Sequence, residues 1–377
     1  MNEIRKIQVI GAGDIGRQVF QGLALSDASR SVQLVGRDEE ATLRAANLTR
    51  FSSVQRGHSA RVSHAVTDLF DVERTAERIA AFQPDIIFLA ASLQSWWVIT
   101  TLPEQAFQRL YQANYGPWLP MHLVPVMKAM QAVRLADSPA VVVNAAYPDA
   151  VHPALTAVGL SPEIGIGNVA NNVPGIRVGA ADLLGVHPSE VEVRLVAHHY
   201  VSHRLSRTGD AGAASMGLAV LHHGRDITAE LDIGALLGSL PHRYRRTGGL
   251  AGQVMTAASA LSVLEPLATG RDALVHAPGP LGLVGGYPVA LEGGRIRLEL
   301  PQGLSADDAV KINESGQLQD GISDIRPDGT VLFEESSMAV LTRELGYDCA
   351  EMPLDQAEGR AREITERLAA YRQRVTR

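Results

Sequence analysis

The stretch that decides the fold is Lys6-Ile7-Gln8-Val9-Ile10-Gly11-Ala12-Gly13-Asp14-Ile15-Gly16, which runs into an apolar pattern at helical spacing. The apolar run predicts a buried strand, the glycines a tight turn, and the spacing that follows a helix. Gly11 permits the turn, Gly13 lets a pyrophosphate approach the backbone, and Gly16 allows the helix to pack closely on the strand. The N-terminus of that helix favours an anion. We therefore predict a dinucleotide site made of Gly11, Ala12, Gly13, Asp14, Ile15 and Gly16.

Apolar runs alternate with helical patterns along the first 150 residues. The runs are 31–35, 61–65, 85–90 and 140–144, and the helical stretches lie near 70–82 and 104–133. This order predicts an α/β fold with a doubly wound parallel sheet, a Rossmann domain over residues 1–150. A C-terminal α+β domain for substrate and oligomerisation is predicted over residues 151–377.

Ligands of such sheets bind beyond the carboxyl ends of the strands. This places Ala90, Ala91 and Asn144 at the nicotinamide end of the cofactor. Asn144 is predicted to orient the nicotinamide or the substrate, the alternative being an ordinary asparagine of a strand-end turn.

The end of the second strand predicts which cofactor is used. An NAD-specific site usually has an acid there for the ribose 2′-hydroxyl, and this chain has Gly36-Arg37-Asp38. Gly36 removes the carboxylate that would repel a 2′-phosphate, and Arg37 offers a fork of donors to it. We predict NADP(H), with NAD as second choice if Asp38 takes the ribose and Arg37 is a solvated charge.

Composition and charge narrow the class of protein. The 377 residues are 46% hydrophobic and 20% charged, which is typical of a globular protein, and the net charge of −7 with scattered basic residues argues against nucleic acid and anionic membranes as partners. The single Cys349 excludes a disulfide framework. No export signal or membrane span is evident, so we expect a cytoplasmic protein.

Two further phrases in the middle of the chain carry a family resemblance. They are Leu184-Gly185-Val186-His187-Pro188-Ser189 and residues 191–199, which end in His198-His199. With the glycine turn, Asn114 and Asn144, they resemble the lactate/malate dehydrogenase superfamily and, beyond it, the NAD-dependent family 4 glycosidases. The resemblance puts His199 on the catalytic histidine and Asn114 in the cofactor site. It also implies a homo-oligomer, a dimer or tetramer.

The chain departs from that family where a small hydroxy acid is bound. In the family, an acid and an arginine three residues apart on one helix face orient the histidine and bind the substrate carboxylate. Here those positions are Asn172 and Gly175, and the loop 93–103, which carries further arginines in the family, has none. Because bidentate arginine contacts align such a carboxylate, we predict a substrate other than a simple 2-hydroxy acid.

Four residues are predicted to contact this substrate. Trp96 and Trp97 favour a larger or less charged ligand, the alternative being packing in a lid or interface. Asn168 and Asn171 lie in a polar stretch just before a helix, where they form a cleft wall for neutral groups or cap the loop.

His199 is the predicted acid/base, because reduction of a carbonyl or imine needs a proton that histidine supplies near neutral pH. The alternative is a structural, hydrogen-bonded histidine. Asn172 is predicted to hold its tautomer, and a neutral amide should raise the pKa of His199 less than a carboxylate would. Tyr147 and Tyr200 are secondary acid/base candidates or packed rings.

Several histidines raise the question of a metal site, since imidazole is a common ligand. They are His198, His199, His203, His222 and His223. On a strand, His198 and His199 would face opposite sides, which counts against one shared ion. The manganese-binding cysteine of the glycosidases has no counterpart near Gly167-Asn168, and we predict no metal.

Signals are weaker in the rest of the chain. Residues 202–210 are polar and without period, which predicts a surface loop. Residues 282–289 and 295–300 predict a turn followed by strands, and the amphipathic segment 354–371 predicts a helix that closes the second domain.

The sequence thus predicts an NADP(H)-dependent oxidoreductase that transfers hydride at a carbonyl, alcohol or imine carbon of a small molecule. His199, Asn172 and Asn144 are its predicted catalytic residues. The alternatives are a redox-assisted elimination or hydrolysis of the glycosidase type, and a non-catalytic NADP-binding sensor.

Overall fold

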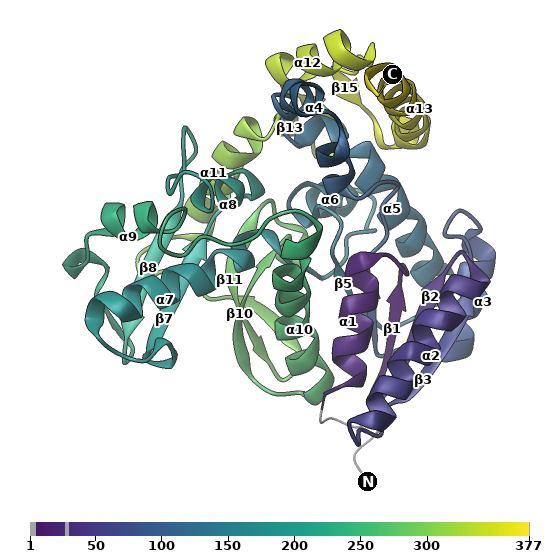
Figure 1. Ribbon diagram of the computed structural model, residues 1–377, viewed down its shortest axis with the longest axis horizontal. Coiled ribbons are helices and arrows are strands. Elements are labelled where there is room, and N and C mark those ends of the chain that lie inside the picture. Colours follow the sequence, from purple (N-terminus) through teal and green to yellow (C-terminus); the bar gives the residue numbers. More distant parts are fainter. Residues whose placement is uncertain (1–4, 27–29, 377) are drawn as a thin grey trace.

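The largest sheet of the computed structural model, which describes residues 5–26 and 30–376, has six parallel strands (Figure 1). Their order across the sheet is β3-β2-β1-β4-β5-β6. The strands are β1 (Arg5–Ile10), β2 (Arg30–Gly36), β3 (Arg61–Val66), β4 (Ile86–Leu89), β5 (Val141–Asn144) and β6 (Ile164–Gly165). This order is that of a Rossmann sheet, so the predicted fold class is confirmed.

Both faces of the sheet are covered by helices, because successive residues of a strand point to opposite sides. Ile7 and Val9 belong to the hydrophobic cluster under α1 (Asp14–Ala24) and α10 (Gln253–Thr269), together with residues of α2 (Glu39–Gln55). Ile10 belongs to the opposite cluster, which contains α3 (Val72–Phe82) and α5 (Pro120–Leu135). The apolar runs of β1, β2, β4 and β5 are therefore largely buried strands, whereas the edge strand β3 has no buried residue.

The helical stretch predicted over 104–133 is broken in the middle. It forms α4 (Glu104–Tyr111), the 3₁₀ turn η2 (Gly116–Trp118) and α5. Asn114 has a φ of 56°, in the left-handed region that ends a right-handed helix. A single helix over this range was therefore a wrong prediction.

The C-terminal half carries three small antiparallel sheets, as the α+β prediction requires. Their strands are β7 (Val191–Val196), β8 (Gly217–His222) and β9 (Arg225–Asp226); β10 (Ala273–Pro278), β11 (Gly286–Glu292) and β12 (Arg295–Leu298); and β13 (Ile322–Ile325), β14 (Val331–Phe333) and β15 (Glu351–Met352). The remaining helices are α6 (Pro148–Thr156), α7 (Val173–Leu184), α8 (His199–Leu205), α9 (Ile233–Ser239), α11 (Ala306–Gln319), α12 (Glu335–Leu345) and α13 (Ala357–Val375).

The final helix does not pack where the sequence suggested. Ile364 and Leu368 of α13 are buried in the same cluster as α5, and Lys128 of α5 pairs with Glu358 at 2.9 Å. Figure 1 shows α12 and α13, at the yellow end of the chain, beside α4 and α5. The segment 354–371 thus forms the predicted helix but covers the N-terminal half. The reason is that α5 is apolar nearly all round and needs a second cover besides the sheet. The division of the chain at residue 150 stays a prediction.

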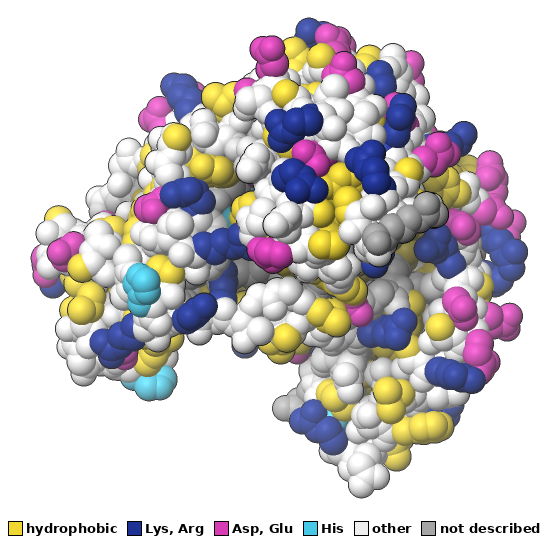
Figure 2. Space-filling model, turned by 45° about the horizontal axis from the view of Figure 1, so that its top comes forward, with side chains coloured by type: hydrophobic (Ala, Val, Ile, Leu, Met, Phe, Trp, Pro, Cys, Tyr) yellow, Lys and Arg dark blue, Asp and Glu magenta, His cyan; other side chains and the backbone are white. Residues whose placement is uncertain are grey.

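The surface in Figure 2 shows Lys and Arg side chains dispersed among Asp and Glu, without one large patch of a single sign on that face. Within residues 5–26 and 30–376, no helix combines the length and apolar character needed to cross a bilayer.

Candidate active site

The turn between β1 and α1 has the shape that the glycine pattern predicted. Gly11 has a φ of +113°, and a Cβ added to it would lie 2.5 Å from the carbonyl oxygen of Ala90. A Cβ on Gly16 would lie 1.8 Å from the oxygen of Gly11, whereas one on Gly13 would meet nothing within 4 Å. Gly13 precedes α1 without any side-chain cap, so the helix amides there are free for an anion. The turn therefore fits a pyrophosphate.

The NADP prediction concerns Gly36, the last residue of β2, and the two residues after it. A Cβ on Gly36 would lie 2.3 Å from Oγ1 of Thr42, so this position is closed to a larger side chain unless Thr42 turns away. The Asp38 carboxylate accepts a hydrogen bond of 2.8 Å from the amide of Ala41 and caps α2. Arg37 is exposed.

The carboxyl ends of β1, β4 and β5 form one row, because Ile10 pairs with Leu89 and Leu89 with Asn144. Ala90 and Ala91 follow β4 at this edge, beside the glycine turn. The sheet therefore presents the predicted cofactor residues of three strands together.

The side-chain amide of Asn144 is hydrogen-bonded to neighbouring residues of the protein. Its side chain is fully buried; Oδ1 accepts from the amide of Ala146 at 2.9 Å, and Nδ2 lies 3.1 Å from Nε2 of His152. Burial lowers the pKa of His152 to about 4, so this ring is neutral and accepts at Nε2 while Nδ1 bonds Gly279 at 2.6 Å. These contacts are those of the strand-end turn that the sequence left as the alternative. Asn114 likewise donates to Oγ of Ser337 at 3.1 Å, toward α12.

His199 packs against Tyr147, which comes three residues after β5, and is bound to a carboxylate. Its Nδ1 is 2.8 Å from Oδ2 of Asp320, at the end of α11, and the same oxygen accepts the hydroxyl of Tyr147 at 2.7 Å. The amide of His199 donates to Oδ1 of Asp149 at 2.9 Å. Asp320 is 3% exposed, so both of its partners meet it away from bulk water. His199 is thereby held by two acids from distant parts of the chain.

The charges of this pair support each other. Burial alone would lower the pKa of His199, but the Asp320 carboxylate and its hydrogen bond outweigh burial and raise it. Burial would raise the pKa of Asp320, and His199 with Tyr147 lowers it instead. Both shifts favour the charged forms, an imidazolium–carboxylate pair.

His198 and His199 are not on a strand, which corrects the sequence prediction. β7 ends at Val196, His198 caps α8 and His199 is the first residue of that helix. The buried ring of His198 accepts from the amide of Tyr200 at 3.3 Å, and burial lowers its pKa. The predicted surface loop 202–210 is also partly wrong, because Ser202 and Leu205 are buried residues of α8.

Asn172 does not contact His199, contrary to the predicted role. Its Nδ2 donates to the carbonyl of Ser202 at 3.0 Å, and its Oδ1 accepts from Arg246 at 3.2 Å. The family's acid position was the wrong place to look for the partner of His199. Asp320 supplies that carboxylate from a part of the chain 121 residues further on.

A cavity of about 340 Å³ lies beside Asn172. Its lining residues are Asn171, Asn172, Pro174, Gly175, Val178, Ser206, Leu240, Tyr244, Arg245, Arg246 and Met255. The guanidinium of Arg246 reaches the carbonyl of Asn171 as well as Asn172. An arginine that the sequence did not single out thus stands at the position where the family has its acid and arginine pair.

The four predicted substrate residues fall into two groups. Asn168 donates to Asp149, the carboxylate that also holds the amide of His199, and Asn171 lines the cavity. Trp96 and Trp97 lie in the 3₁₀ helix η1 (Trp96–Thr101), where Trp96 is 40% exposed and the indole N–H of Trp97 is buried without a partner among the described residues.

Two aromatic rings, those of His203 and Tyr147, pack against the ring of His199. The His203 ring stacks on it at 5.9 Å between centroids, and Nδ1 of His203 is 2.9 Å from the hydroxyl of Tyr111, which also accepts from Arg207. Burial, His199 and Arg207 lower the pKa of His203 to about 3, so it stays neutral. Tyr147 packs edge-on to His199 with centroids 5.5 Å apart, whereas the ring of Tyr200 has Arg204 over it.

No family model matches this chain, and no curated protein matches it either. Its fold is nevertheless that of the malate and lactate dehydrogenases, as the resemblance predicted. The malate dehydrogenase of Cryptosporidium parvum is 16% identical, with a TM-score of 0.56 over 84% of this chain and 96% of that one.

Two lactate dehydrogenases are similar to the same degree. That of Eimeria maxima, solved with NADH and oxamate, is 14% identical with a TM-score of 0.57, over 84% of this chain and 92% of that one. That of Cryptosporidium parvum, solved with lactic acid and nicotinamide adenine dinucleotide, is 18% identical with a TM-score of 0.56, over 85% and 96%. These likenesses define the fold of this chain.

Proposed function

We propose that the protein is an NADP(H)-dependent oxidoreductase that transfers hydride to or from a carbonyl, alcohol or imine carbon of a small molecule. The observation that carries this proposal is the His199–Asp320 pair, held at the edge of the sheet where the glycine turn fits a pyrophosphate. Two lactate dehydrogenases of the same fold, 14% and 18% identical to this chain, were solved with NADH or nicotinamide adenine dinucleotide. This supports a nicotinamide cofactor here.

The chain's own residues supply the proton. Asp320 binds Nδ1 of His199, which leaves Nε2 as the nitrogen that gives a proton to the substrate heteroatom or takes it away. Asp149 fixes the backbone of His199, and Tyr147 helps keep Asp320 ionised by donating to it. The bound nicotinamide would supply or accept the hydride. Gly11, Gly13 and Gly16 would hold its pyrophosphate against the N-terminus of α1.

NADP(H) is the proposed form of the cofactor. Asp38 is engaged in capping α2, so it is a poor ribose ligand, and the closed position at Gly36 leaves no room for an acid. The exposed Arg37 remains as a donor for a 2′-phosphate.

The substrate is proposed to be other than a simple 2-hydroxy acid. The cavity beside Asn172 is spacious and polar at one wall, and Arg246 offers donors there to a carbonyl or an anionic group. Malate and lactate dehydrogenases of the same fold lend no support to the glycosidase or sensor alternatives.

A homo-oligomer is proposed as well. Leu48, Phe51 and Val54 lie three residues apart on α2 and are 65%, 65% and 70% exposed. Such an apolar stripe on a surface helix is typical of an interface, and a second copy of the chain supplies a matching stripe. The predicted cytoplasmic location stays a prediction.

The experiment that tests the function follows deuterium from NADPH that carries deuterium in both C4 positions into a panel of aldehydes, ketones and imines. Mass spectrometry should find the label on carbon in the product of the wild type, and His199→Gln should reduce the rate by about 10²–10⁴-fold. Label transfer at the same rate in His199→Gln would remove His199 from the mechanism. Product without any label on carbon would exclude hydride transfer.

A further inference from the structure

Three ligand-type side chains meet at the end of the β7–β8–β9 sheet that lies farthest from His199. Glu190 directly precedes β7, His222 ends β8, and His223 begins the turn to β9. The register pairs Val191 with His222, so the two strands bring these residues to the same end. His199 follows the opposite end of β7, about 25 Å away at the rise of an extended strand.

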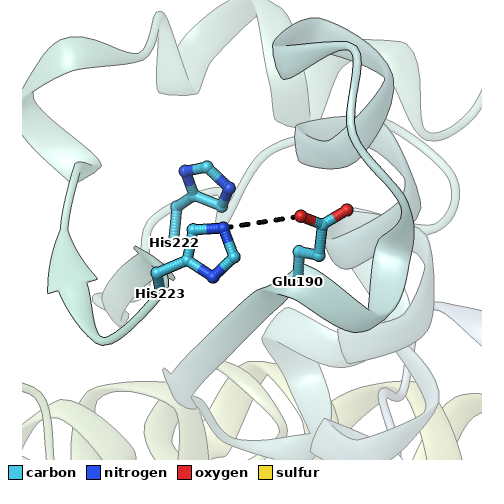
Figure 3. A group of neighbouring side chains, drawn as sticks. All are labelled: Glu190, His222 and His223. Carbon is cyan, nitrogen blue, oxygen red and sulfur yellow. Dashed lines mark ion pairs between the residues drawn. The ribbon is translucent and has the colours of Figure 1, made fainter.

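The three side chains point toward one another, as Figure 3 shows. One carboxylate oxygen of Glu190 and one ring nitrogen from each histidine all lie within 4.8 Å of one another. Nε2 of His223 is 3.4 Å from Oε2 of Glu190, and the two imidazole rings have centroids 4.2 Å apart. Among the described residues, this is a compact group of two nitrogen ligands and one oxygen ligand.

One ring nitrogen of His222 has no hydrogen-bond partner among the described residues. This nitrogen, Nε2, is buried. A buried polar atom without a partner costs about 1–3 kcal/mol, and an ion or an ordered water is a common explanation. Oε1 of Glu190 is satisfied by the amide of His187 at 2.9 Å, which fixes the carboxylate and leaves Oε2 facing the histidines.

The turn between β8 and β9 holds the second histidine in place. It has two residues, His223 with a φ of 51° and Gly224 with a φ of 76°, which is the two-residue turn that best fits a twisted hairpin. Asn-Gly is the common sequence of such a turn, and His at its first position presents an imidazole beside His222 instead. His223 is 68% exposed, so its side chain is free to close on an ion.

We propose that Glu190, His222 and His223 form a zinc site. Two imidazole nitrogens and one carboxylate oxygen are ligands that Zn²⁺ takes at about 2.0–2.2 Å, with water in the fourth tetrahedral position. Ligand atoms of such a site lie roughly 3.3 Å apart. Nε2 of His223 and Oε2 of Glu190 are already 3.4 Å apart, close to that spacing. Nitrogen ligands disfavour Mg²⁺ and Ca²⁺, which take oxygen.

The ion would tie the β8–β9 hairpin to the start of β7. Because it lies at the far end of β7 from His199, its effect is on the stability of this sheet and not on the proton at His199. Zinc binding can therefore be tested independently of the proposed oxidoreductase activity.

Isothermal titration of the untagged, metal-stripped chain with ZnCl₂ tests this proposal. We expect one Zn²⁺ per chain and a melting temperature that rises with the logarithm of the free zinc concentration above the dissociation constant. His223→Asn, which suits the left-handed turn and so preserves the fold, should weaken zinc binding at least tenfold, as should Glu190→Gln. MgCl₂ should give no such heat.

His242→Ala is the matched control, because His242 is an exposed histidine of the same half of the chain. It should bind zinc as the wild type does. The proposal is overturned if the wild type takes up no zinc below millimolar concentration, or if His223→Asn and Glu190→Gln bind it unchanged. A stoichiometry of one ion for two chains, with dimers appearing on addition of zinc, would equally overturn it.

Discussion

At the scale of single residues, the chemistry rests on a histidine and an acid that the chain order does not connect. His199 follows β7, and Asp320 ends α11. Their side chains meet at 2.8 Å, where burial strengthens the attraction between the two charges. In the malate and lactate dehydrogenase family the acid comes from the helix before the histidine, and here the position is an asparagine that binds Arg246.

Asp320→Asn tests this pair directly. Without the carboxylate, burial dominates and the pKa of His199 should fall from above its ordinary value, about 6.5, to below it. An NMR titration of the His199 ring in the wild type and in Asp320→Asn measures this shift. An unchanged His199 titration would show that Asp320 does not govern its proton.

The same pair makes stability depend on pH in a defined window. The folded pKa of His199 is raised, so its stabilising contribution is complete below about pH 6.5 and is lost as pH rises through the raised value. The folded pKa of Asp320 is lowered, so its contribution is present above about pH 3.9 and is lost at lower pH. Urea unfolding of the wild type and Asp320→Asn should therefore differ most between these limits.

Arg37 is the residue on which the cofactor preference depends. Arg37→Gln should weaken NADPH binding about tenfold or more, since a charge-assisted contact to phosphate is lost, and leave NADH binding within a factor of two. Fluorescence titrations with both cofactors provide the comparison. Equal losses for NADPH and NADH would mean that Arg37 does not read the 2′-phosphate.

Some residues could be assigned from the sequence and others could not. Gly11 and Gly16 were assigned because the motif encodes close contacts within one turn. Asp320 was missed because nothing local marks a helix-end aspartate as the partner of a histidine 121 residues away. Arg246 was missed for the same reason, since only folding brings its loop to Asn172.

At the scale of elements, the strand–turn–helix unit of β1 and α1 positions the cofactor. The strands β1 to β5 were predicted closely because most of them are buried and read as apolar runs. The two-residue strand β6 was not predicted, because it is too short to give a pattern. The break at Asn114 was not predicted, because only a left-handed backbone at one polar residue divides α4 from α5. The helical start of α8 was also missed, since the apolar pattern of β7 runs on past Val196.

Gly13→Ala and Gly16→Ala form a matched pair of tests for this element. A Cβ at position 13 meets nothing in the protein, so Gly13→Ala should keep its melting temperature and lose at least tenfold in NADPH affinity as the methyl group meets the pyrophosphate. A Cβ at position 16 collides with the backbone of Gly11, so Gly16→Ala should lose stability as well. Thermal melts and NADPH titrations separate the two effects. Undiminished NADPH binding by Gly13→Ala would place the phosphate elsewhere.

At the scale of the whole molecule, the last helices of the chain pack against helices that come before residue 136. The last helices, α12 and α13, pack on α4 and α5, and Arg109 of α4 pairs with Glu344 of α12 at 3.0 Å. The amphipathic pattern of α13 predicted a helix, but a pattern does not say which distant apolar surface it will cover. Asp320 lies on the path from α11 to these final elements, so the return of the chain also brings the acid to His199.

The apolar stripe on α2 makes a prediction about assembly. Phe51→Glu should shift the protein toward monomers in sedimentation velocity, because a charge in an apolar interface is costly to bury. Arg362→Glu, at an exposed position on α13, is the control and should leave the assembly unchanged. A wild type that sediments as a monomer at micromolar concentration would contradict the proposed interface.

The most direct test of the central claim is a fluorescence titration of the purified chain with NADPH and with NADH. We predict saturable binding of NADPH, at least tenfold tighter than that of NADH, because the glycine turn holds the pyrophosphate and Arg37 the 2′-phosphate. Binding of neither cofactor would contradict the claim that this fold serves hydride transfer. The proton held between His199 and Asp320 would then need another explanation.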